Sequence, residues 1–121
     1  MGKTVLIVDD SMSIRQLVKA TLLTKGYTVV DACDGVDALK KLGLQRVNLV
    51  ISDVNMPNMD GITLLKAIKA QPEHRFTPVI MLTTESQEGM KREGQAAGAK
   101  AWIVKPFQPE LMLAAVEKLL M

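Results

Sequence analysis

Five polar residues whose side chains could do chemistry together stand at the ends of short apolar runs of the sequence. One run leads into Asp9 and Asp10, a second ends before Asp53, a third leads into Thr83, and a fourth is followed by Lys105. In open α/β sheets, ligands bind outside the carboxyl ends of the strands, so neighbouring strands would bring these side chains to one pocket. Three carboxylates a few ångströms apart repel one another, which raises the pKa of at least one of them. A hard divalent cation relieves that repulsion, because Mg²⁺ takes oxygen ligands and keeps several waters.

Residues of these types suit the transfer of a phosphoryl group to a carboxylate. An aspartate is a competent nucleophile for forming an aspartyl phosphate. The protein then has to position the group and neutralise charge rather than supply elaborate acid–base chemistry. The metal and Lys105 would neutralise the phosphoryl oxygens, and the Thr83 hydroxyl would donate a hydrogen bond to one of them.

Each of these residues also has an ordinary structural interpretation when it is considered alone. Asp10 and Ser11 could cap the first helix, because both residue types favour that position. Thr83 could be a β-branched strand residue, and Lys105 could be a solvated lysine at the end of a strand. Only the combination of the acids with Lys105 favours a metal and phosphoryl site over these alternatives.

Short apolar runs alternate with segments of helical spacing along the chain. The runs are 5–8, 28–30, 49–51, 79–82 and 102–104. Four of the five are continuous rather than alternating, which is typical of parallel strands that are covered on both faces. Repeated strand–helix units of this length predict an α/β fold, with a parallel sheet, right-handed crossovers and helices on both faces.

The segments between the runs carry apolar residues at the spacing of amphipathic helices. Pro109 can begin a helix, and Gly26 and Gly98 can end one. The fourth helix, roughly residues 85–97, has two interior glycines that each cost about 1 kcal/mol relative to alanine, so we expect it to be marginal. The expected core-facing positions are Ile14, Leu17, Val18 and Leu22 in the first helix, Val36, Leu39 and Leu42 in the second, Leu64, Leu65 and Ile68 in the third, and Met112, Ala115, Val116 and Leu119 in the last.

The composition favours one compact domain over residues 1–121. The chain is 48% hydrophobic and has a formal net charge of +2. Its length fits one domain, and without a dense tract of Lys and Arg it is not expected to bind nucleic acid. The first apolar run is too short for a signal peptide or a membrane span, so a cytoplasmic protein is the simplest interpretation. The single cysteine, Cys33, is expected to be a small buried residue.

Four motifs surround the polar residues, and together they are highly specific. They are Val8-Asp9-Asp10-Ser11, Asp53-Val54-Asn55-Met56-Pro57 with Asp60-Gly61, Leu82-Thr83-Thr84, and Lys105-Pro106-Phe107. They resemble the receiver domains of two-component response regulators and, within that family, the stand-alone chemotaxis regulators. The resemblance covers the whole chain. It implies a flavodoxin-like, doubly wound sheet of five parallel strands in the order 2-1-3-4-5 with five helices, in a receiver domain that has no output domain.

The resemblance also implies how the acids divide the work. Asp53 matches the phosphoacceptor of the family. Asp9 and Asp10 match the acidic pair that binds Mg²⁺, for which Mn²⁺ is expected to substitute. The backbone carbonyl of Asn55 would be a further metal ligand.

Other positions match residues that hold the phosphoryl group, set its lifetime or signal its presence. Thr83 matches the switch hydroxyl, and Lys105 matches the phosphate-binding lysine, after which the peptide bond is often cis in the family. Asn55 and Glu85 match the positions that tune phosphoryl lifetime. Trp102 stands where the family usually has Tyr, Phe or His, the aromatic that turns inward on activation. An indole is larger and needs a partner for its N–H, so we expect its inward rotation to be incomplete.

The implied function is a signalling switch rather than an enzyme. A histidine kinase would phosphorylate Asp53, a phosphatase could remove the group, and a monomer would signal by binding a protein, in chemotaxis the flagellar motor switch. The expected output surface is the fourth helix, fifth strand and fifth helix.

Two alternative functions stay open. One is a phosphate sink or relay without an effector of its own. The other is a Mg²⁺-dependent phosphohydrolase of the haloacid-dehalogenase type, a family with an acid two residues after its nucleophile, where this chain has Asn55.

Overall fold

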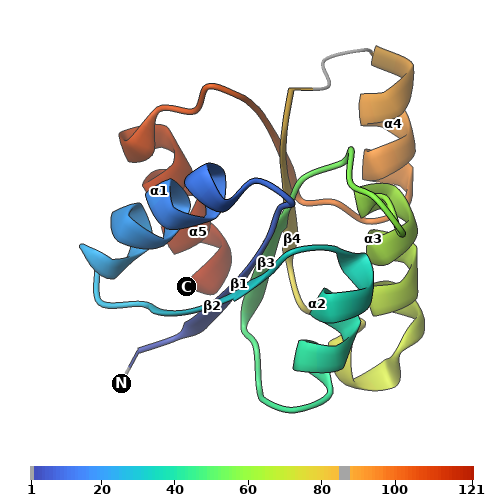
Figure 1. Cartoon of the computed structure of the whole chain (residues 1–121), viewed down its shortest axis with the longest axis horizontal. Helices are drawn as coiled ribbons and strands as arrows, with labels where there is room; N and C mark the ends of the chain where they lie inside the picture. The colour runs from blue at the N-terminus through green and yellow to red at the C-terminus, as the bar shows by residue number, and fades with distance from the viewer. Residues whose placement is uncertain (1, 85–87) are drawn as a thin grey trace.

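Strands and helices alternate along the chain in the computed structural model, which describes residues 2–84 and 88–121 (Figure 1). Within these residues the elements are β1 (Thr4–Val8), α1 (Met12–Leu23), β2 (Thr28–Ala32), α2 (Gly35–Leu42), β3 (Leu49–Ser52), α3 (Gly61–Ala70), a short 3₁₀ turn η1 (Pro72–His74), β4 (Val79–Thr83), α4 (Glu88–Ala96), β5 (Ala101–Val104) and α5 (Pro109–Leu120). The predicted strand–helix alternation is confirmed. No helix within the described ranges is long and apolar enough to cross a membrane.

The strands form one parallel sheet with helices on both faces. The order is β2-β1-β3-β4-β5, and each neighbouring pair is parallel. In Figure 1, α1 and α5 cover one face, while α2, α3 and α4 cover the other. The apolar residues accordingly form two clusters, one on each side of the sheet. The α/β class, the strand order 2-1-3-4-5 and the five helices of the described chain therefore match the expectation.

The register of the central strands sets the edge at which polar residues gather. Val8, the last residue of β1, pairs with Ser52, the last residue of β3. The next residues along the chain are Asp9 and Asp53, so the two acids leave the sheet side by side. All residues of β3 and β4 are buried, because both faces of these strands are covered by helices.

The ends of several helices carry capping residues at the N-terminus or glycines just past the C-terminus. The Ser11 hydroxyl accepts a hydrogen bond from the Ile14 N–H at 3.4 Å, so Ser11 rather than Asp10 caps α1. The Asp60 carboxylate caps α3 in the same way, with its Oδ1 2.8 Å from the Thr63 nitrogen. Gly26 and Gly98, just past α1 and α4, have φ values of 81° and 112°, a region in which a side chain is strained. The predicted helix stops are confirmed.

Three apolar residues that we expected to be buried are exposed. Leu17 in α1 is 52% exposed and Val36 in α2 is 51% exposed. Neighbouring helix residues point about 100° apart, so a side chain next to a buried one lies at the flank of the helix face that packs against the sheet. Cys33 is exposed because β2 is an edge strand that ends at Ala32, which leaves the cysteine in the following loop.

Candidate functional site

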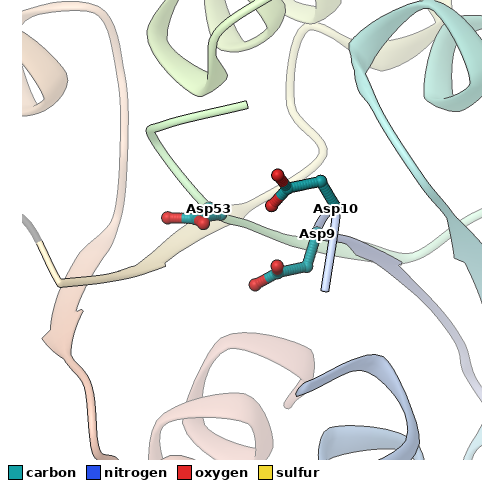
Figure 2. A group of neighbouring side chains, drawn as sticks. All are labelled: Asp9, Asp10 and Asp53. Carbon is teal, nitrogen blue, oxygen red and sulfur yellow. The ribbon is translucent and has the colours of Figure 1, made fainter. Parts of the chain in front are cut away.

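Three aspartates converge at the carboxyl ends of β1 and β3. Each of Asp9, Asp10 and Asp53 places a carboxylate oxygen within 4.8 Å of the others. Figure 2 shows the three side chains as neighbours. Asp9 and Asp53 are buried, whereas Asp10 is exposed. The convergence predicted from the strand ends is confirmed for all three acids.

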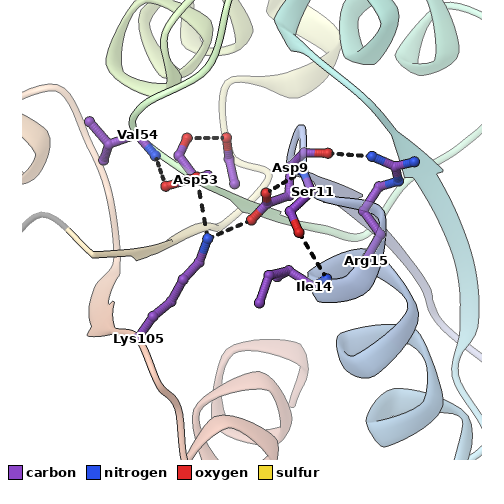
Figure 3. Close-up of polar contacts among 8 residues, drawn as sticks. Asp9, Ser11, Ile14, Arg15, Asp53, Val54 and Lys105 are labelled. Atoms are coloured by element: carbon purple, nitrogen blue, oxygen red, sulfur yellow. Dashed lines mark hydrogen bonds and ion pairs between the residues drawn. The ribbon is translucent and has the colours of Figure 1, made fainter.

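Lys105, which follows the carboxyl end of β5, contacts this acidic cluster. Its Nζ lies 2.8 Å from Asp9 Oδ2 and 3.3 Å from Asp53 Oδ2 (Figure 3). The side chains of Lys105, Asp9 and Asp53 are 11%, 3% and 10% accessible to solvent, so these ion pairs are shielded from it. The peptide bond between Lys105 and Pro106 is cis, as the resemblance implied. Lys105 is therefore part of the same site, although it is 52 residues from Asp53, the nearest acid of the cluster in the sequence.

Backbone groups hold the two buried carboxylates in place. Asp9 Oδ1 accepts the Ser11 N–H at 2.9 Å, and Asp53 Oδ1 accepts the Val54 N–H at 2.7 Å. The Asp53 N–H donates to the Val8 carbonyl at 2.9 Å, which ties the acid to the central strands. In each of these two acids, Oδ1 therefore accepts a backbone N–H and Oδ2 accepts a hydrogen bond from Lys105.

Burial and charge act in opposite directions on the ionisable groups of the cluster. Burial raises the pKa of Asp9 above its ordinary value, and the hydrogen bonds from Lys105 and Ser11 offset only part of this effect. Burial lowers the pKa of Lys105, but its hydrogen bond to Asp9 and the charge of Asp53 outweigh this, so the pKa lies above its ordinary value. Lys105 is therefore charged at neutral pH. Burial makes ionisation of the Asp9 carboxyl group less favourable in the folded protein than in the unfolded chain.

The donor set fits a hard divalent cation. All three acids offer oxygen, the ligand type that Mg²⁺ prefers, and the exposed Asp10 leaves one side of the cluster open to waters that the ion would keep. Asp9, Asp10 and Asp53 would hold the ion, and its charge would offset the repulsion among carboxylates that Lys105 alone does not cancel. These three acids belong to the ligand set that the sequence resemblance implied for Mg²⁺.

Asp9→Asn should make the metal-free protein more stable and remove its response to Mg²⁺. Because the pKa of Asp9 is higher in the folded protein than in the unfolded chain, stability is lost as the pH rises through the folded pKa, and an amide avoids that loss. For the wild type, Mg²⁺ at a hundred times its Kd should add about 2.7 kcal/mol to the free energy of unfolding. Thermal unfolding at neutral pH with EDTA or with Mg²⁺ measures both effects.

Asp10→Asn is the matched control, because Asp10 is an acid of the same cluster that stays exposed to solvent. It should also weaken the response to Mg²⁺, but it should leave the stability of the metal-free protein near that of the wild type. A metal-free Asp9→Asn protein that unfolds at a lower temperature than the wild type would contradict the assigned cost of ionised Asp9.

The remaining predicted site residues lie at different depths around the acids. Thr83 is fully buried at the end of β4, and its carbonyl accepts the Lys105 N–H at 2.8 Å. Asn55 is exposed in the segment between β3 and α3. Trp102 is half-buried in β5 and lies against α4, where a Cβ on Gly94 would come within 2.7 Å of its ring. Glu85 lies outside the described residues.

Three residues that were not predicted support the cluster directly. Arg15 donates from Nη1 to the Asp9 carbonyl at 2.7 Å. The Ser52 hydroxyl donates to the Asp53 carbonyl at 2.9 Å. Gly61 packs so closely on Asp53 that an added Cβ would lie 1.9 Å from the Asp53 carbonyl oxygen. All three act on backbone carbonyls, a type of contact that residue spacing does not reveal. Gly61 alone had a sequence signal, because it belongs to the Asp60-Gly61 motif.

A comparison with protein families finds one that covers nearly the whole chain. The model of the response regulator receiver domain matches residues 5–117. Among curated proteins, the alkaline phosphatase synthesis transcriptional regulatory protein PhoP of Bacillus subtilis is 38% identical over 120 residues, which are 99% of this chain and 49% of PhoP. The chain therefore spans about half the length of that relative.

Solved structures match the fold over its full extent. Chemotaxis protein CheY4 of Vibrio cholerae is 48% identical with a TM-score of 0.93, covering 98% of this chain and 99% of that one. The receiver domain of sensor histidine kinase PA1611 from Pseudomonas aeruginosa is 27% identical with a TM-score of 0.90, covering 99% of this chain and 98% of that one. The PA1611 structure has a magnesium ion coordinated in its active-site cleft.

Proposed function

Because the chain belongs to the response regulator receiver domain family, we propose that Asp53 is the residue that accepts the phosphoryl group from a histidine kinase. Receiver domains are phosphoacceptors that switch signalling and are not enzymes that turn over an external substrate. The observation that carries the assignment is that the Asp53 carboxylate lies next to both the acidic pair and Lys105, with Oδ2 3.3 Å from the lysine Nζ.

Asp53 is better placed than Asp9 to act as the nucleophile. Both Asp9 oxygens are held, Oδ1 by the Ser11 N–H and Oδ2 by Lys105 at 2.8 Å. Asp53 Oδ2 has the longer contact with the lysine, so less free energy is lost when that oxygen turns to phosphorus. Asp9 and Asp10 would then hold the metal, with Asp53 and the Asn55 backbone carbonyl completing the protein ligands.

In the transfer step, a carboxylate oxygen of Asp53 bonds to phosphorus as the bond between phosphorus and the donor imidazole breaks. The imidazole leaves with the electron pair and takes up a proton from water. Lys105, already charged and within reach of the acid, stabilises the negative charge on the phosphoryl oxygens. A bound Mg²⁺ would supply further neutralisation of the same oxygens.

The signal is expected to leave through Thr83 and Trp102. Thr83 is buried beside Lys105, and the register of β4 on β5 pairs it with Val104, two residues beyond Trp102. A hydrogen bond from the Thr83 hydroxyl to the phosphoryl group would shift the end of β4 and favour a different position of the tryptophan against α4. Phosphorylation would thereby change the populations of two states of the surface formed by α4, β5 and α5.

The chemotaxis role is proposed for this chain because CheY4 of Vibrio cholerae, a chemotaxis protein, matches it over the full length. We infer a cytoplasmic, monomeric receiver domain, phosphorylated by a chemotaxis-type histidine kinase and read by the flagellar motor switch. A phosphatase could shorten its signal. Asn55 and Glu85 are proposed to set the phosphoryl lifetime by controlling the attacking water.

Phosphoryl uptake from acetyl phosphate tests the proposed chemistry. The protein should incorporate radiolabelled phosphoryl when Mg²⁺ or Mn²⁺ is present, and chelation with EDTA should abolish the uptake. Release of phosphate from a panel of phosphomonoesters should stay at the level without protein, because no acid stands two residues after Asp53. Steady turnover of those esters would instead favour the phosphohydrolase alternative.

Binding to a motor-switch peptide separates the effector role from a phosphate sink. Beryllofluoride mimics the phosphoryl group on aspartate, so it should tighten peptide binding by the wild type. Equal affinity with and without beryllofluoride would contradict the effector role and leave the sink or relay alternative.

A further inference from the structure

Arg15 joins the acidic cluster to the edge of the sheet. It lies in the first turn of α1, and its guanidinium makes two charge-assisted hydrogen bonds (Figure 3 shows the one to Asp9). Nη1 donates to the backbone carbonyl of Asp9 at 2.7 Å, and Nε donates to Asp31 Oδ2 in β2 at 3.0 Å. The Arg15 side chain is 14% accessible, so the fork of donors is held within the structure rather than solvated.

The Asp9 carbonyl belongs to the peptide group that carries Asp10. β1 ends at Val8 and α1 begins at Met12, so Asp10 lies between the two elements. The direction of its carboxylate depends on the plane of that peptide. Asp9 itself is fixed by its N–H, which donates to the Ala32 carbonyl, and by its side-chain contacts. The bond from Arg15 fixes the carbonyl on the other side of Asp9 and hence the start of the Asp10 residue.

We propose that Arg15 is a positioning residue for the divalent cation, because it orients the peptide group from which Asp10 reaches the metal. The inference rests on the metal site of the proposed function and adds a residue that does not itself touch the ion. Asp31 would hold the guanidinium in place from β2 and neutralise its charge.

Charge and positioning predict opposite effects of removing Arg15. The positive charge of Arg15 near the acids opposes the binding of a second cation. Charge alone therefore predicts that removal of Arg15 tightens Mg²⁺ binding. Loss of a group that orients a metal ligand typically weakens metal affinity about 10–100-fold. The sign of the change in Mg²⁺ affinity therefore identifies the role.

Isothermal titration of Mg²⁺ into Arg15→Met tests the proposal. Methionine keeps much of the apolar stem of the side chain and removes every donor. The Kd for Mg²⁺ should rise about tenfold or more, and phosphoryl uptake should recover as the Mg²⁺ concentration is raised. An unchanged or lower Kd in the folded variant would overturn the proposal.

Two further variants keep the outcome decisive. Lys19→Met removes the same charge from an exposed residue of α1, and should bind Mg²⁺ as the wild type does. Arg15→Lys keeps the charge but lacks the planar fork. If Arg15→Met does not fold, a Kd raised in Arg15→Lys supports the proposal, and a wild-type Kd in Arg15→Lys overturns it.

The same titrations separate this inference from the proposed function. Weaker binding of Mg²⁺ by Asp10→Asn than by the wild type establishes the metal site independently of phosphorylation. If Arg15→Met then binds Mg²⁺ normally, only the role of Arg15 is wrong. If phosphoryl uptake does not depend on Asp53, the proposed acceptor is wrong while the titrations of Arg15 still stand.

Discussion

Asp53→Asn is expected to abolish phosphoryl uptake from acetyl phosphate. Asparagine has nearly the same shape, and its carbonyl oxygen can still accept the Val54 N–H, so the fold should be preserved. Its amide is not a nucleophile that forms an acyl phosphate. Uptake should fall roughly a thousandfold or more, as it does elsewhere when a covalent nucleophile is lost. Radiolabel incorporation at saturating Mg²⁺, alongside thermal unfolding of both proteins, measures the effect.

Asp60→Asn is the matched control for that loss. Asp60 belongs to the segment that follows Asp53, and its side chain caps α3, a role that asparagine fills about equally well. The control should take up phosphoryl at the wild-type rate. Robust labelling of Asp53→Asn would refute the assignment of the acceptor.

Gly61→Ala should disable the site through the backbone of Asp53. The added methyl would lie 1.9 Å from the Asp53 carbonyl oxygen and 2.9 Å from its carbonyl carbon. These are main-chain atoms between β3 and α3, so a side-chain rotation cannot relieve the clash with them. Overpacking of this kind costs about 1–3 kcal/mol of stability. Displacing the Asp53 backbone by a few tenths of an ångström or more should also weaken Mg²⁺ binding and slow phosphoryl uptake about tenfold or more.

Gly89→Ala provides the comparison at a site with open space. Among the described residues, and leaving aside the chain neighbours and backbone of α4 itself, no atom lies within 4 Å of a Cβ added to Gly89. Alanine there should raise the free energy of unfolding by up to about 1 kcal/mol, because glycine disfavours helix. Phosphoryl uptake at the wild-type rate by a Gly61→Ala protein of unchanged melting temperature would contradict the close contact with Asp53.

The sheet and the convergence of the acids follow from properties that the sequence displays directly. Continuous apolar runs mark strands with both faces covered, and residues that follow such runs lie at one edge of a parallel sheet. This placed Asp9, Asp53 and Lys105 together although long stretches of sequence separate them. The strand order came from the family resemblance, because apolar runs do not encode which strands are neighbours.

Other features depend on packing that residue types do not encode. Leu17 and Val36 have helical spacing, but a helix on a sheet buries only a narrow stripe, and its exact rotation depends on the neighbouring elements. Cys33 is exposed because its strand lies at the sheet edge and ends one residue earlier. Arg15 acts through a long side chain on a backbone carbonyl, a contact that any arginine in the first turn of a helix could make or miss.

The chemical identity of the phosphorylated residue tests the central claim most directly. Borohydride reduces an acyl phosphate to an alcohol, so a phosphorylated aspartate is converted to homoserine and can be located by peptide mass spectrometry. After reaction of the wild type with acetyl phosphate and Mg²⁺, we predict homoserine in place of Asp53 and unmodified aspartate at Asp9 and Asp10. Homoserine at Asp9 or Asp10, or at no position in a protein that has gained phosphoryl, would contradict the account.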